Sequence, residues 1–187
     1  RKRMESKGPV AVANVPPEYR IGSKPRFIQS DGTGLTKIYD FLYLGSWRNV
    51  TEIGNLKKFG ITGVLNAAAE YKVLEQVRCR DRQSNADYEF AVCFLNLYKD
   101  QRHIPSPASE IASGIRFIDG ERKKGGKVLV QCNNGIERAA AVALAYFMRE
   151  EKMSYDRALA ALRNRGVVIH PTSWLEDVLG DVMSDDE

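Results

Sequence analysis

The sequence predicts an α/β domain with a central, mostly parallel sheet that is flanked by helices on both faces. Short apolar segments typical of strands alternate along the chain with longer segments of helical spacing, which is the pattern of a sheet whose parallel strands are joined by helices. Hydrophobic residues make up 43% and charged residues 28% of the 187 residues. This balance and this length suit one globular domain with a substantial core.

Four segments are expected to form strands: 38–45, which includes a turn, 61–66, 88–97 and 127–130. The last of them, Lys127-Val128-Leu129-Val130, is a short apolar run of the kind found in a buried central strand. Ligands of such sheets bind beyond the carboxyl ends of the strands, so the loop after Val130 is the first place to look for a site.

Helices are expected at 51–59, 106–124, 136–150, 154–165 and 173–183. The second has three isoleucines at helical spacing, and the glycine pair that begins at Gly125 is a common terminator. Ser154 and Ser173 are the expected N-caps of the last two helices, since each precedes an apolar periodic segment.

Residues 1–35 are expected to form an N-terminal extension, loosely ordered or packed on the domain, because they are rich in Pro, Gly, Ser and charge. The domain itself is expected to span 36–184. No apolar run approaches the roughly 18 residues of a membrane-spanning helix, and the basic N-terminus lacks the apolar core of a signal peptide. We therefore expect a soluble intracellular protein of the cytoplasm, the nucleus or both, without a membrane span.

The charge pattern does not indicate a nucleic-acid partner. The net charge is only +4, and basic residues are mixed with acidic ones rather than gathered into a stripe with interleaved aromatics. We interpret them as a solvated surface, whose slight positive excess favours association with an anionic partner. Nothing such as a heptad run requires a dimer, so a monomer is expected.

The three cysteines, Cys79, Cys93 and Cys132, form no CxxC pair, and with His103 and His170 as the only histidines there is no zinc-ligand spacing. An odd number of cysteines without a disulfide framework indicates reduced thiols. No metal or other cofactor is expected. The chemical question is whether one of the three thiols is reactive.

Residues 131–138, with the sequence Gln-Cys-Asn-Asn-Gly-Ile-Glu-Arg, form the candidate site. A short loop that leaves a strand and enters a helix points successive backbone N–H groups inward and makes a site for a tetrahedral dianion. Gly135 lets the backbone curl tightly, and the positive field favours the nucleophilic thiolate of Cys132. Arg138 can fold back so that its guanidinium grips two phosphate oxygens. The expected phosphate-binding residues are Asn133, Asn134, Gly135, Ile136, Glu137 and Arg138.

The spacing of Cys132 and Arg138 is by itself a weak pattern. A buried cysteine at the end of a strand, followed six residues later by a solvent-facing helical arginine, would give the same sequence. The strand–loop–helix setting favours the functional interpretation, because it supplies the anion site that both side chains would serve.

Several separate segments resemble the dual-specificity branch of the protein tyrosine phosphatases. They are 38–46, 60–68, 128–138 and parts of 145–159, and the resemblance extends from Ile38 to Val182. It implies the fold of that family and a cysteine-dependent phosphatase activity with a phosphocysteine intermediate. It also implies phosphorylated protein substrates, with a shallow pocket for phosphotyrosine, phosphoserine or phosphothreonine. Cys132 and Arg138 match the family's nucleophile and phosphate-gripping arginine.

The resemblance further implies a general acid. Asp100 lies just after an expected strand and 32 residues before Cys132, which matches the family's acid. That residue protonates the leaving oxygen and then activates water. An ordinary loop aspartate is the alternative for Asp100. Asp119 is a weaker candidate, because helical spacing places it beside surface lysines and arginines.

The sequence departs from the family at three positions around the thiol. Gln131 stands where the family has a histidine that supports the ionised thiol, and glutamine cannot carry a positive charge. Ala139 replaces a Ser or Thr whose hydroxyl helps the thiolate leave. Glu137 places a carboxylate in an anion-binding loop, where it either points to solvent or opposes a dianion. We therefore expect Cys132 to be a poorer nucleophile at neutral pH than in its relatives.

Two interpretations follow. The favoured one is an atypical, slow dual-specificity protein phosphatase, since the minimal machinery is present. The other is a catalytically impaired pseudophosphatase that binds a phosphorylated partner or serves as a scaffold. A phosphoinositide substrate is less expected, because the loop has no lysine. RNA 5′-phosphatase and carbohydrate-phosphatase activities, which occur in the wider family, are neither supported nor excluded by the sequence.

Overall fold

The computed structural model describes residues 34–68, 89–97, 106–171 and 177–179. Within them, five strands form one sheet in the order β1-β2-β5-β3-β4. The neighbours β2, β5, β3 and β4 pair in parallel, whereas β1 pairs with β2 in the antiparallel sense. The expected α/β fold with a mostly parallel sheet is therefore confirmed. The strands are β1 (Thr36–Tyr39), β2 (Leu42–Ser46), β3 (Gly63–Asn66), β4 (Ala91–Phe94) and β5 (Val128–Cys132).

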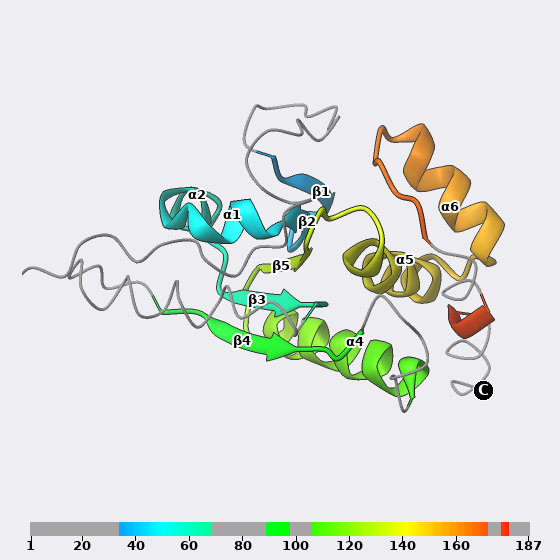
Figure 1. The fold of residues 1–187 in the computed structure, drawn as a ribbon, viewed down its shortest axis with the longest axis horizontal. Coiled ribbons are helices and arrows are strands. Elements are labelled where there is room, and N and C mark those ends of the chain that lie inside the picture. Colours follow the sequence, from blue (N-terminus) through cyan, green and yellow to red (C-terminus); the bar gives the residue numbers. More distant parts are fainter. Residues whose placement is uncertain (1–33, 69–88, 98–105, 172–176, 180–187) are drawn as a thin grey trace, which may run out of the picture.

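Helices cover both faces of the sheet (Figure 1). Apolar side chains from α1 and α2 pack on one face in a core that includes Val64 and Leu129. Side chains from α4, α5 and α6 build the larger core on the other face, around Leu65 and Val130. The helices are α1 (Trp47–Thr51), α2 (Ile53–Phe59), α4 (Pro107–Lys123), α5 (Arg138–Glu151) and α6 (Tyr155–Asn164).

The central helix α5 is held close to the sheet by its small residues. Every side chain from Arg138 to Met148 is buried, and five alanines among them let the helix backbone approach β2 and β5. Helix α4 packs along one side of α5 and α6 along another (Figure 1). The start of α5 is therefore fixed directly beyond the end of β5.

Several predicted boundaries move in the structure. The central strand continues two residues past Val130, because Gln131 O accepts a hydrogen bond from Ala67 N at 2.8 Å and so extends the sheet. Helix α5 begins at Arg138 rather than at Ile136, since the Ile136 carbonyl accepts the His170 N–H at 2.7 Å instead of taking a helical partner.

Other expectations have mixed outcomes. The segment 38–45 lies in a β1–β2 hairpin. The helix expected at 51–59 is present as α2, which begins two residues later, at Ile53. The short helix α1 before it was not expected, and Glu52 separates the two. Ser106 and Ser154 are the N-caps of α4 and α6. Of the last expected helix, 177–179 are helical and the remainder lies outside the described residues, as does nearly all of the expected extension 1–35.

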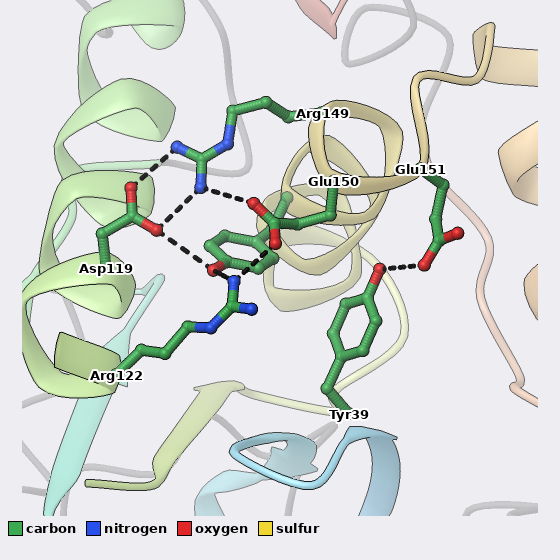
Figure 2. Close-up of polar contacts among 7 residues, drawn as sticks. Tyr39, Asp119, Arg122, Arg149, Glu150 and Glu151 are labelled. Atoms are coloured by element: carbon green, nitrogen blue, oxygen red, sulfur yellow. Dashed lines mark hydrogen bonds and ion pairs between the residues drawn. The ribbon is translucent and has the colours of Figure 1, made fainter. Parts of the chain in front are cut away.

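A polar cluster ties α4 and β1 to the far end of α5 (Figure 2). Arg149 donates to both carboxylate oxygens of Asp119, at 2.8 and 2.7 Å, and the Tyr146 hydroxyl donates to the same carboxylate at 3.0 Å. The Tyr39 hydroxyl donates to Glu151 at 2.7 Å. Asp119 is thus engaged in helix packing, away from the loop at the start of α5. No helix in the described ranges is long and apolar enough to cross a membrane.

Candidate functional site

The thiol of Cys132 lies at the end of the central strand. Cys132 is the last residue of β5, is only 2% exposed, and pairs in register with Ser46 at the end of β2. The backbone N–H of Gly135 donates to its Sγ atom at 3.2 Å. A backbone N–H directed at the sulfur, where a strand leads through a loop into a helix, suits a nucleophilic or anion-binding role.

Gly135 curls the loop in a way that only glycine allows. Its φ is +76°, and a Cβ built on it would lie 2.6 Å from the carbonyl oxygen of Gly45. The loop is therefore pressed against the end of β2, with its own N–H turned toward Cys132. The sequence-based expectation of a tight curl at Gly135 agrees with this geometry.

The end of β2 is in turn held by Asn49, which the sequence analysis did not single out. The Asn49 Oδ1 atom accepts from the Ser46 backbone N–H at 2.7 Å and from the Ser46 hydroxyl at 3.1 Å. Asn49 is 5% exposed. A signal was present in the sequence, since a serine three residues before a polar amide resembles a capping box.

Arg138 is the first residue of α5 and is 5% exposed. Its Nη1 donates to the Leu97 carbonyl at 2.9 Å, across the carboxyl edge of the sheet. The buried guanidinium thus joins the loop to the chain that follows β4. Asp100 comes three positions after Leu97 in the sequence and lies outside the described residues, so its expected role as the acid stays a prediction.

The remaining loop residues differ in exposure. Asn133 is buried and Asn134 exposed, while Ile136 and Glu137 are half-buried. Glu137 occupies the N-cap position of α5, and its carboxylate has no hydrogen bond or ion pair with any residue that the structure describes. A carboxylate at a helix N-terminus interacts favourably with the helix dipole, but it competes with an incoming anion for the same field.

Gln131 lies on the opposite face of the sheet from Cys132. It is 2% exposed and sits in register between Gly45 and Asn66. Its side chain makes no hydrogen bond within the described part of the chain, although a buried amide without partners is unfavourable. Ala139 is fully buried and supplies no hydroxyl near the thiol.

Of the other two cysteines, the structure describes Cys93. Cys93 lies partly buried on β4, and burial, followed by the charge of Glu110, raises its pKa above the ordinary value, which disfavours its thiolate. Cys79 lies outside the described residues. In the same ranges, no group of three or more His, Cys, Asp or Glu side chains gathers in a way that could hold a metal ion.

This geometry agrees with the comparison to known families. Residues 42–180 match the family model described as the dual specificity phosphatase catalytic domain. The chain belongs to the dual specificity phosphatase family. The matched range contains the whole of the loop between β5 and α5, so the family resemblance seen in the sequence is confirmed.

Curated members of the dual specificity phosphatase family are about 30% identical to the chain. Dual specificity protein phosphatase 2 of Mus musculus is 30% identical over 149 residues, which cover 80% of this chain and 43% of that protein. Dual specificity protein phosphatase 1 of Homo sapiens is 30% identical over 141 residues, 75% of this chain and 35% of that protein. The chain thus spans less than half the length of these relatives.

Solved structures of the dual specificity phosphatase fold superpose on the chain at lower identity. The crystal structure of DUSP15 gives a TM-score of 0.66 at 22% identity, over 80% of this chain and 87% of that one. The human tyrosine phosphatase-like serine/threonine/tyrosine-interacting protein gives 0.62 at 24% identity, over 81% and 97%. At this identity the likeness concerns the fold, which it confirms.

Proposed function

We propose that the chain is a slow, cysteine-dependent protein phosphatase that acts on phosphotyrosine and on phosphoserine or phosphothreonine. The observation that carries this proposal is the Gly135 N–H directed at the Cys132 Sγ atom at 3.2 Å, within a loop that leads into α5 at Arg138. A sulfur that accepts a backbone hydrogen bond where a strand–loop–helix anion site begins is arranged to face a bound phosphoryl group.

The proposed reaction has two steps. The Cys132 thiolate attacks phosphorus, so that the S–P bond forms as the ester P–O bond breaks, and the carboxyl group of Asp100 gives its proton to the leaving oxygen. Water then attacks the phosphocysteine, the Asp100 carboxylate takes the water proton, and the S–P bond breaks to release inorganic phosphate and the thiolate. Backbone N–H groups of the loop and the Arg138 guanidinium would carry the charge on the phosphoryl oxygens throughout.

A pseudophosphatase that binds phosphorylated proteins is the second candidate, and it has specific support. Gln131 is buried without a side-chain hydrogen bond to any described residue, and its neutral amide offers no positive charge to the loop that follows. Ala139 contributes no hydroxyl to the second step, and Glu137 opposes the charge of a dianion. These features weaken turnover more than they weaken binding of a phosphoryl group by the loop amides and Arg138.

Hydrolysis of an aryl phosphate separates the two functions. The enzyme should hydrolyse it slowly, and Cys132→Ser should abolish turnover. A wild-type protein without turnover, in which Gln131→His or Gln131→His with Ala139→Ser restores it, would support the pseudophosphatase. If the wild type and both of these variants are inert, the loop does not perform this chemistry and the proposed enzyme function is wrong.

A further inference from the structure

We propose that Asn49 is a positioning residue for the phosphate-binding loop. It acts through the peptide unit that joins Gly45 to Ser46, and so sets the direction of the Gly135 N–H toward Cys132. The inference deepens the proposed function and rests on it in one respect: the task of the loop is taken to be holding a phosphoryl group against the Cys132 sulfur. Asn49 itself would touch neither the substrate nor the sulfur.

The first step of the argument is the contact between Asn49 and the end of β2. The Asn49 Oδ1 atom accepts two hydrogen bonds from Ser46, from the backbone N–H at 2.7 Å and from the hydroxyl at 3.1 Å. Asn49 is 5% exposed, so these bonds are largely shielded from water. A buried acceptor with a short backbone bond holds the Gly45–Ser46 peptide plane in one orientation.

The second step is the space above Gly45. A Cβ built on Gly45 would lie 2.8 Å from Asn49 Oδ1 and 3.0 Å from a methyl group of Leu35. Glycine at this position therefore allows the carboxamide of Asn49 to lie close against the strand. The same carboxamide could not reach Ser46 if position 45 carried a side chain.

The third step links this peptide unit to the loop. The Cβ that Gly135 lacks would lie 2.6 Å from the Gly45 carbonyl oxygen and 3.2 Å from the Ser46 nitrogen. Gly135 is thus seated on the very peptide unit that Asn49 holds. Because Ser46 is also the register partner of Cys132, the support lies directly beside the sulfur that receives the Gly135 N–H.

These contacts predict that Cys132 reacts more slowly when the Asn49 side chain is truncated to alanine. In Asn49→Ala the Gly45–Ser46 peptide loses its buried acceptor and can rotate, which lengthens or tilts the Gly135 N–H bond to Cys132. Iodoacetamide reacts with the thiolate, so the Cys132 alkylation midpoint should rise by about one pH unit and the rate below it should fall about tenfold. Protection of Cys132 by inorganic phosphate should weaken as well.

Thr51→Val is the matched control. The Thr51 hydroxyl donates to the Arg48 carbonyl at 2.8 Å, so its hydrogen bond stays within the same short helix. This variant should lower stability without moving the alkylation midpoint. A shift in Thr51→Val equal to that in Asn49→Ala would mean that loss of α1, rather than the Asn49 contact, disturbs the thiol, and would overturn the proposal.

Gly45→Ala disturbs the same contact between Asn49 and Ser46 without changing Asn49. It therefore remains informative if Asn49→Ala does not fold. Its new methyl group pushes Asn49 Oδ1 away from Ser46 and should shift the midpoint in the same direction. In the double variant Gly45→Ala with Asn49→Ala, the shift should match that of Asn49→Ala and not the sum, since both act through one hydrogen-bonded unit. Additive shifts would contradict a shared route.

The experiment is alkylation of the full chain across pH, with the Cys132 peptide followed by mass spectrometry so that Cys79 and Cys93 do not interfere. An Asn49→Ala midpoint equal to that of the wild type overturns the inference. Hydrolysis of an aryl phosphate is measured separately on the same proteins. A wild type that alkylates normally but does not turn over would count against the proposed enzyme function only.

Discussion

Gly135 and Gly45 face each other across the start of the loop: a Cβ on Gly135 would lie 2.6 Å from the Gly45 carbonyl oxygen, and the φ of Gly135 is +76°. Gly135→Ala is strained on both counts. We expect its free energy of unfolding in urea to fall by about 1–3 kcal/mol, and phosphate to protect Cys132 less from alkylation.

Gly120→Ala is the control for this substitution. Gly120 lies inside α4 with nothing within 4 Å of the position of its missing Cβ, so alanine should raise stability by about 0.5–1 kcal/mol. If Gly135→Ala is as stable as Gly120→Ala, the loop can move away from Gly45 without loss of stability. That result would contradict the prediction that the close approach of Gly135 to Gly45 requires glycine.

Arg138→Lys should separate charge from geometry in phosphate binding. The substitution keeps the positive charge but loses the planar fork and the Nη1 bond to the Leu97 carbonyl, which is 2.9 Å long in a buried setting. We expect inorganic phosphate to bind about 10- to 100-fold more weakly, as measured by protection of Cys132. Arg157→Lys on the exposed side of α6 should leave this affinity unchanged. Equal phosphate affinities of Arg138→Lys and the wild type would show that the Arg138 guanidinium does not bind the phosphate.

Glu137→Gln should strengthen phosphate binding. The carboxylate stands at the N-cap of α5, half-buried and without an ion pair to any described residue, so it repels a bound dianion. Removing a repulsion on the order of 1–2 kcal/mol should tighten binding by about 5- to 30-fold at low salt, and less at high salt. Glu89→Gln, just before β4 at the amino edge of the sheet, should have no effect. Unchanged affinity in Glu137→Gln would place that carboxylate in solvent, away from the ligand.

The elements that sequence alone predicted are those whose signal is local. The short apolar run up to Val130 is typical of a buried strand, and the alanine-rich segment of α5 is typical of a helix. Gly135 indicates a tight turn without information from distant residues. These features were enough to locate the candidate loop. Their boundaries moved by two residues because residues distant in sequence supply hydrogen bonds there: Ala67 N extends β5, and His170 N takes the Ile136 carbonyl out of the helix.

The break between α1 and α2 at Glu52 could not be predicted from the neighbouring residues, since neither proline nor glycine occupies that position. Val50 and Leu56 are both fully buried in one core. Six residues turn an α-helix by about 600°, which would put these two side chains on different faces of a continuous helix. The core therefore imposes the break. The contact between Asn49 and Ser46 is local and has capping-box spacing, but the sequence could not show that β2 pairs with β5 and so brings this contact near the loop.

Acid should weaken the pair between Asp119 and Arg149. Burial alone would raise the pKa of Asp119, but hydrogen bonds from Arg149 and Tyr146 outweigh it and hold that pKa below its ordinary value. A depressed folded-state pKa gives stability that is complete above the unfolded value, near pH 4, and is lost as pH falls through the folded value. Asp119→Asn should thus cost about 1–2 kcal/mol in urea at pH 7.

The difference between the wild type and Asp119→Asn should shrink as the pH falls below about 4, because the wild-type carboxylate then takes up a proton and loses its charge. Asp40→Asn is the control, since Asp40 pairs with Lys37 in full contact with water and screening leaves such a pair little effect on stability. A gap between Asp119→Asn and the wild type that stays constant from pH 7 to pH 2 would mean that the carboxylate contributes by packing and neutral hydrogen bonds. In that case its charge would not be what joins α4 to α5.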